Sequence, residues 1–114
     1  MTELTREPFD ALNQQAIYFM KQVERAWLFA SEVYTKTGLA MTLSPQEQVN
    51  TVRLIFYQYV EGELENGAEC DFDDPKHVFV TIYDVDSGPT VEEYIPRAEA
   101  LKRVVKAARK AMKS

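Results

Sequence analysis

The first third of the chain has apolar residues at helical spacing. Between about Pro8 and Thr37 they recur at intervals of three and four positions, which places them on one side of an α-helix. This predicted core face consists of Phe9, Leu12, Ala16, Phe19, Val23, Trp27, Ala30 and Tyr34. Gly38 is typical of the position just beyond a helix end, so we expect one long helix that ends near Thr37.

A second helix is predicted after a short connection. Residues 44–47, Ser-Pro-Gln-Glu, have the pattern of a capping box with proline in the first helical position. The helix would run to about residues 62–65, and its buried face would consist of Val49, Val52, Ile55, Phe56, Tyr59 and Val60. Two consecutive amphipathic helices joined by a short loop most simply form an antiparallel hairpin.

The hydrophobic pattern changes in the second half of the chain. Residues 62–76 contain two glycines, a proline and a run of acids, and this composition predicts a loop. Residues 77–84 alternate between apolar and other side chains, and residues 90–95 can form a second strand of a hairpin. Pro96 then opens a C-terminal helix. The predicted fold class is α+β in the order α-α-β-β-α: a long helical hairpin, a β-hairpin and a basic amphipathic helix.

Length and composition are typical of one globular domain. The chain has 114 residues, 46% of them hydrophobic and 27% charged, so we expect residues 1–114 to form a single domain. Cys70 is the one cysteine, which excludes an internal disulfide and fits a reducing compartment. We find no signal-peptide pattern and no run of about 18 apolar residues, so we expect a cytoplasmic protein that does not cross a membrane.

Charge is strongly segregated along the chain, although the net charge is only −5. Residues 61–93 contain one Lys and eleven Asp or Glu, whereas residues 94–114 contain seven Lys or Arg and one Glu. An acidic block is therefore followed by a basic helix. Clustered charges steer association and set specificity, so this segregation favours a function that depends on the surfaces of the protein.

The most conspicuous candidate for chemistry is Asp84-Val-Asp86, which follows a predicted strand. It resembles the phosphoryl-transfer motif of the haloacid-dehalogenase hydrolases, but those enzymes need a large domain after the motif, and only 28 residues follow Asp86. The stretch also fails as a calcium loop, because Ile95 stands where a bidentate Glu is needed. We expect these acids to start a turn, since short acidic side chains accept hydrogen bonds from nearby backbone groups.

No other residues suggest a catalytic, metal or cofactor site. Cys70 and His77 are too few ligands for zinc, and the acidic surroundings of Cys70 do not favour a reactive thiolate. The sequence has no glycine-rich phosphate loop and no nucleophile elbow. We therefore predict no enzyme activity, no metal and no cofactor, and a small enzyme or metal-binding protein that uses Asp84 and Asp86 is an alternative.

The C-terminal helix has a basic side opposite a thin, alanine-rich apolar side. The basic side consists of Lys102, Arg103, Lys106, Arg109, Lys110 and Lys113. It could bind the phosphates of a nucleic acid, face solvent, or pair with the acidic segment of the same or another copy. An overall pI near 4.9 and the absence of interleaved aromatic residues disfavour nucleic acid.

The first helix has apolar residues outside its predicted core face. Ile17 and Leu28 are eleven positions apart, so they lie above one another on the otherwise polar side, and Tyr18 and Phe29 do the same one step further round. Tyr57 lies off the core face of the predicted second helix. Such residues are either covered within the same domain or offered to a partner.

The predicted function is that of a non-enzymatic protein–protein interaction protein: a small regulator, inhibitor or assembly factor, with a homodimer expected. The candidate partner-binding residues are Ile17, Tyr18, Leu28, Phe29, Tyr57, Asp71, Asp73 and Asp74. The aromatic and aliphatic residues would anchor the partner, and the acids would select a basic one. Compact acidic proteins of this kind are common among accessory proteins of phages and mobile elements, which is an association of composition only. Nucleic-acid binding by the basic helix is the other alternative.

Overall fold

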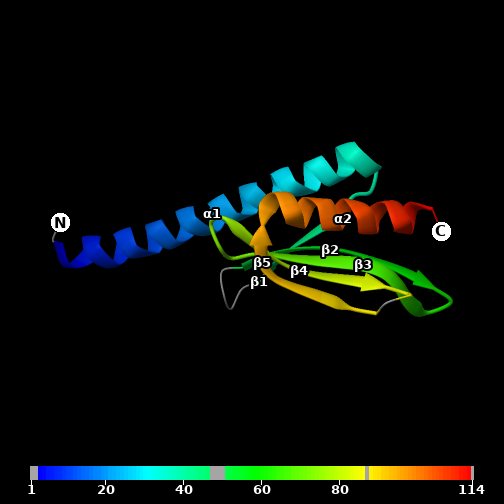
Figure 1. Cartoon of the computed structure of the whole chain (residues 1–114). Helices are drawn as coiled ribbons and strands as arrows, with labels where there is room; N and C mark the ends of the chain where they lie inside the picture. Colours follow the sequence, from blue (N-terminus) through cyan, green and yellow to red (C-terminus); the bar gives the residue numbers. More distant parts are fainter. Residues whose placement is uncertain (1–2, 47–50, 87, 114) are drawn as a thin grey trace.

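A computed structural model describes residues 3–46, 51–86 and 88–113 of the chain (Figure 1). The elements are α1 (Glu3–Thr37), β1 (Thr42–Gln46), β2 (Thr51–Val60), β3 (Glu63–Phe72), β4 (His77–Asp84), β5 (Thr90–Pro96) and α2 (Arg97–Met112). The strands form one antiparallel sheet in the order β1-β2-β3-β4-β5, so each strand pairs with the next along the chain. The predicted α+β class is confirmed, but the helical hairpin is wrong, because strands occupy the place of its second helix.

Both helices lie on the same face of the sheet, side by side, and α1 extends well beyond the sheet toward the N-terminus (Figure 1). α1 packs over β2, whereas α2 packs over β3 and β4. The molecule is accordingly elongated, with extents of 61 × 26 × 22 Å. In the part of the chain that is described, no helix is long and apolar enough to cross a membrane.

The segment predicted as the second helix is the strand β2. Val52, Leu54 and Phe56 face the helices and are buried, while Arg53 and Tyr57 point to the opposite face. Residues 51–60 are rich in β-branched and aromatic side chains, which favour strands, but apolar residues occur on both faces and obscure the alternation. Of the predicted capping box, residues 44–46 lie in the edge strand β1 and Glu47 lies outside the described residues, as does Val49 of the predicted face.

The segment predicted as an acidic loop is the central strand β3. Ala68, Cys70 and Phe72 alternate toward the helices and are fully buried, while Glu69 and Asp71 point to the uncovered face. An antiparallel sheet tolerates one solvated face, so acids at alternate positions are compatible with a central strand. The charge run concealed this strand pattern.

The hairpin of β4 and β5 and the helix α2 agree with the prediction. The turn between the strands contains the expected Asp84 contacts: the backbone N–H of Asp86 donates to the Asp84 carboxylate at 2.8 Å, and that of Gly88 donates to the Asp84 carbonyl at 2.7 Å. α1 also ends where predicted, at Thr37, and Gly38 follows it with φ of +80°.

The buried side of α1 differs from the predicted core face. Its fully or nearly fully buried members are Gln22, Ala26, Phe29 and Val33. Trp27 and Tyr34, predicted to be in the core, are exposed. Phe29, predicted to bind a partner, instead packs edge-to-face on Phe72 of β3. Because α1 is apolar on more than one side, its periodicity alone could not decide which side meets the sheet.

Candidate protein-binding surface

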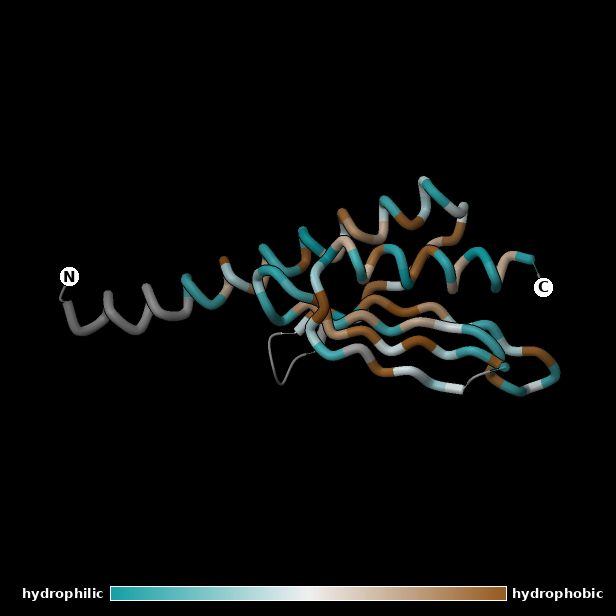
Figure 2. The backbone as a smooth tube through the Cα atoms, viewed as in Figure 1, coloured by the Kyte–Doolittle hydropathy of each residue, from teal (hydrophilic) through white to brown (hydrophobic). Residues whose placement is uncertain are grey.

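The side of α1 that faces away from the sheet carries a row of large apolar side chains. We call it the α1 stripe; its apolar members and their exposed fractions are Ile17 (49%), Met20 (68%), Trp27 (66%), Leu28 (53%) and Tyr34 (58%). Figure 2 shows hydrophobic positions interspersed with hydrophilic ones along α1, including part of the helix that runs past the sheet. Isolated exposed apolar residues are ordinary, but a contiguous group that includes a mostly exposed Trp is typical of an interaction surface.

The α1 stripe borders two grooves. One, of about 490 Å³, lies on the helix itself and is lined by Ile17, Met20, Lys21, Val23, Glu24, Trp27 and Leu28. The other, of about 390 Å³, lies between α1 and β1 and is lined by Trp27, Ala30, Ser31, Tyr34, Thr35, Ala40, Met41, Leu43 and Leu54. Trp27 lines both grooves, so the two grooves meet at this residue.

Contacts with the β3–β4 turn fix the part of α1 that carries this surface. The Tyr18 hydroxyl donates to the carbonyl oxygen of Asp73 at 2.8 Å, and Arg25 donates to the carbonyl oxygen of Asp74 and, at 2.5 Å, to the side chain of Gln22. Burial lowers the pKa of Arg25, and the charge of Asp74 opposes that shift. Tyr18 therefore has an internal structural contact, although its side chain is still 40% exposed.

Asp71, one of the acids expected to select a partner, is paired within the chain. It accepts two hydrogen bonds from Arg53 on the uncovered face of the sheet, at 2.7 and 3.1 Å. This bidentate pair raises the pKa of Arg53, chiefly through the hydrogen bond to the carboxylate.

The other two acids hold turns and neighbouring side chains in place. Asp73 accepts a hydrogen bond from the Tyr94 hydroxyl at 2.9 Å, which raises the pKa of Tyr94. Asp74 accepts the backbone N–H groups of Lys76 and His77, each at 2.9 Å, and these bonds lower the pKa of Asp74. The three acids thus have hydrogen-bond partners within the chain, and their selection of a basic partner stays a prediction.

Tyr57 lies on the sheet face opposite the helices, within an aromatic group. Its ring lies 6.1 Å from that of Tyr83 and 6.2 Å from that of Tyr59, measured between centroids. Its hydroxyl donates to Glu69. The fold therefore separates Tyr57 from Ile17 and Leu28, and these three residues cannot form one continuous surface.

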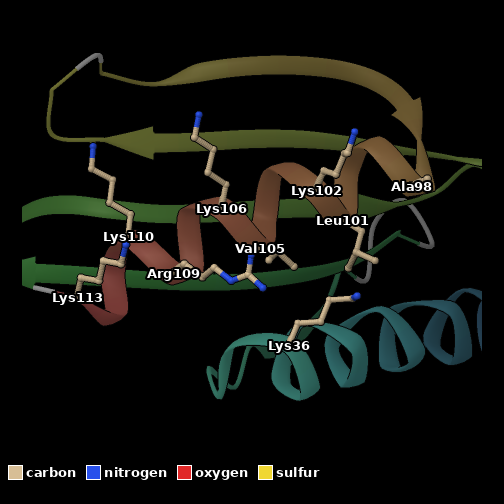
Figure 3. Close-up of a pocket in the computed structure, with 9 residues that line it drawn as sticks. All are labelled: Lys36, Ala98, Leu101, Lys102, Val105, Lys106, Arg109, Lys110 and Lys113. Carbon is tan, nitrogen blue, oxygen red and sulfur yellow. The ribbon is translucent and has the colours of Figure 1, made fainter.

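The basic helix α2 and the end of α1 together form a groove of about 560 Å³ (Figure 3). Ala98, Leu101 and Val105 provide its apolar part, and its cationic residues are Lys36, Lys102, Lys106, Arg109, Lys110 and Lys113. Lys36 comes from α1, and sequence reasoning missed it because only the packing of the two helices brings it beside α2.

One lysine of this groove is paired with the acidic hairpin. Lys110 donates to both carboxylate oxygens of Asp84 at 2.8 Å and to Asp86 at 3.0 Å. These bonds raise the pKa of Lys110, with Asp84 contributing most. Arg103 lines a different groove, between α2 and the β4–β5 hairpin. The expected pairing of basic helix and acidic segment within one copy therefore applies to part of the helix.

The residues considered for catalysis are dispersed. His77 and Asp84 stand at opposite ends of β4, roughly 23 Å apart at about 3.3 Å per residue. Cys70 is fully buried against the helices, and this burial raises the pKa of its thiol well above the usual range. Within residues 3–46, 51–86 and 88–113, no group of three or more His, Cys, Asp or Glu is placed to hold a metal ion.

No protein-family model, curated protein sequence or solved structure matches this chain. Its function is therefore inferred from its surfaces. The α1 stripe contains the predicted Ile17 and Leu28, together with Met20, Trp27 and Tyr34, which sequence reasoning either passed over or placed in the core.

Proposed function

We propose that this chain is a non-enzymatic protein that acts by binding a protein partner through the α1 stripe. The observation that carries the proposal is that α1 is apolar on two sides, and only one of them packs on the sheet. Large apolar side chains on the other side, with Trp27 at the junction of two grooves, have the character of binding anchors. The role that we propose for such a surface is that of a small regulator, inhibitor or assembly factor.

A cytoplasmic location is part of this proposal. It is supported by Cys70, the one cysteine of the sequence, which is a buried free thiol. A reducing compartment keeps such a thiol unmodified.

The decisive test compares two aromatic residues that are about equally exposed on opposite faces. Trp27→Asp on α1 and Tyr59→Asp on the uncovered sheet face alter side chains that are 66% and 61% exposed. Tagged wild-type and variant proteins would be used to capture partners from the native host lysate, after circular dichroism has confirmed that each is folded. We expect the Trp27 variant to lose the captured protein and the Tyr59 variant to retain it. Equal capture by both variants would contradict the proposal.

The basic groove supports a second candidate function, the binding of a nucleic acid. Around its apolar part, Lys36, Lys106, Arg109 and Lys113 have no ion-pair partner among the described residues. A phosphate backbone that contacted all four would make log K fall with log salt at a slope of about −3 to −4. Fluorescence anisotropy with labelled single- and double-stranded DNA and RNA at low salt would measure this slope, and absence of binding would remove the candidate.

A further inference from the structure

We infer that the partner of the α1 stripe is a second copy of this chain, bound with the two α1 helices antiparallel. This inference rests on the proposed function and names the partner. It would give the protein an isologous dimer interface, in which the same surface of each copy meets the other. Such an interface requires a surface that is complementary to itself, and the α1 stripe has this property in both its apolar and its charged residues.

Two charged residues that lie among the apolar residues of the stripe, Lys21 and Glu24, are the more specific evidence. Lys21 and Glu24 both line the groove on α1, and within the described part of the chain neither has an ion-pair partner. When two α1 helices run antiparallel about a twofold axis between Gln22 and Val23, Lys21 of each copy lies at the level of Glu24 of the other. Symmetry repeats the contact, so two opposite-charge pairs form. A parallel arrangement would place like charges together, which is unfavourable.

The same register matches the apolar residues. Ile17 of one copy lies opposite Leu28 of the other, because both positions are equally distant from the axis. Trp27 then lies about two residues, or roughly 3 Å along the helix axis, from the level of Met20 of the other copy, and a thioether in contact with an aromatic ring is a favourable pair. All four of these side chains are about half exposed or more in the single chain. The antiparallel dimer would cover them and leave the two charge pairs near the centre.

The other surfaces of the sheet are less suited to self-association. The edge strand β1 has five residues and contains Pro45, and the edge strand β5 ends at Pro96 and has an irregular register with β4. Short or irregular edges that contain proline resist pairing with a further strand. The uncovered sheet face has its own polar contacts, such as Arg53 with Asp71. The sheet also has exposed apolar side chains, such as Tyr59 and Val91, but α1 carries the mostly exposed Trp27 and Met20 beside the complementary charges of Lys21 and Glu24.

The position of α1 also favours a helical partner. Residues 13–18, the first whose side chains are described, are exposed on every side of the helix. An unsupported helical segment is only marginally stable in water, because helices in proteins gain most of their stability from packing. A second antiparallel α1 would supply this packing where the sheet of the same copy does not reach.

A charge exchange tests the inference on the full chain. Light scattering coupled to size exclusion, and sedimentation equilibrium, would give the mass of the wild type, whose monomer is 13.1 kDa. We expect a dimer. Lys21→Glu and Glu24→Lys, each alone, create two like-charge contacts and should raise the dimer dissociation constant about tenfold or more. The double variant restores opposite charges and should recover the wild-type value. Lys76→Glu, on the exposed β3–β4 turn, is the matched control and should have no effect.

The outcomes separate this inference from the proposed function. A wild type that remains monomeric at high concentration, or a double variant that stays as weak as the single variants, would overturn the antiparallel dimer. If the wild type is monomeric while Trp27→Asp still abolishes capture of a host protein, the partner is another protein and the proposed function holds. If neither self-association nor capture depends on the stripe, both conclusions fail.

Discussion

Phe29 of α1 packs edge-to-face against Phe72 of β3, with their ring centroids 5.4 Å apart and an interplanar angle of 69°. The neighbouring Leu28 points away from the sheet and is 53% exposed. Adjacent residues of one helix therefore have opposite roles: Phe29 attaches α1 to the sheet, and Leu28 belongs to the surface that we propose for binding.

Alanine substitutions distinguish these two roles. Phe29→Ala should lower the free energy of unfolding by about 3–5 kcal/mol, because it removes a large buried ring and leaves a cavity. Leu28→Ala should lower it by less than about 1 kcal/mol, because the side chain is not in the core. Urea titrations of the wild type and both variants measure these free energies. All three should be titrated at the same low protein concentration, so that self-association does not contribute to either value. Equal losses for the two variants would contradict the observed orientation of α1.

Gly67 on β3 should not tolerate even a methyl group. A Cβ at this position would lie 2.8 Å from the carbonyl oxygen of Phe56 and 3.1 Å from the ring of Tyr57. We expect Gly67→Ala to lower the free energy of unfolding by about 1–3 kcal/mol through overpacking. In a Tyr57→Ala background the loss should become smaller, because one of the two obstructing groups is then gone. Chemical denaturation measures both values, and an unchanged midpoint for the single variant would be inconsistent with this packing.

The Cys70 thiol should be unreactive in the folded protein. It is fully buried, and its pKa is raised chiefly by that burial, with smaller contributions from the charges of Asp71 and Glu69. Both effects suppress the thiolate, which is the reactive form. With a chromogenic disulfide reagent at mildly alkaline pH, we expect Cys70 to be labelled only in molecules that have unfolded. Added urea should therefore increase the rate of labelling. Complete reaction of the native protein during mixing would show that the thiol is accessible, and protein in concentrated guanidinium chloride is the positive control.

Asp74 should make the stability of the fold depend on acid pH. Its pKa is lowered from 3.8, first by the backbone N–H of Lys76 and then by that of His77. A carboxylate with a depressed folded-state pKa contributes stability above its unfolded pKa, and this contribution is lost as the pH falls through the folded value. The melting temperature of the wild type should therefore exceed that of Asp74→Asn near neutral pH.

The difference between these two proteins should shrink as the pH is lowered below about 4, because the wild-type carboxylate then becomes protonated. Thermal melts across the acid range would show this convergence. A difference that stays constant down to the lowest pH would indicate that the charge of Asp74 is not involved.

Lys110 of α2 should contribute more to stability than Lys113, which follows the helix. Lys110 bonds to Asp84 and Asp86, whereas Lys113, the C-cap of α2, has no ion-pair partner among the described residues. Lys110→Ala should therefore lower the melting temperature more than Lys113→Ala. Because these groups are near the surface, added salt should reduce the difference.

A double-mutant cycle checks the origin of this effect. The coupling between Lys110→Ala and Asp84→Ala should be favourable at low salt and decline as salt is added. The pKa of Lys110 is raised, so its contribution exists below its usual value of 10.5 and disappears as the pH rises through the folded-state value. Zero coupling at low salt would show that the ion pair does not stabilise the packing of α2 on the hairpin.

Some elements could be predicted because their local patterns allow one interpretation. α1 and its end at Gly38, the hairpin of β4 and β5, and α2 each combine a clear period with a suitable turn or terminal residue. β2 could not be predicted, because apolar residues on both of its faces match helical and strand periods alike. β3 could not be predicted either, because its acids have the composition of a loop, and only the pairing with β2 and β4 places them at alternate positions on the solvated face.

The candidate binding surface, too, could be predicted only in part from the sequence. The sequence by itself determined that α1 has apolar residues on more than one side and that Ile17 and Leu28 share a side, because helical geometry fixes the positions of residues in one helix relative to each other. Only the tertiary structure decided which side meets the sheet, and so that Phe29 is buried while Trp27 is exposed. It also decided that Asp71, Asp73 and Asp74 have partners within the chain. The physical reason is that burial depends on strand pairing and helix docking between residues far apart in the sequence. Local sequence patterns do not determine these long-range contacts.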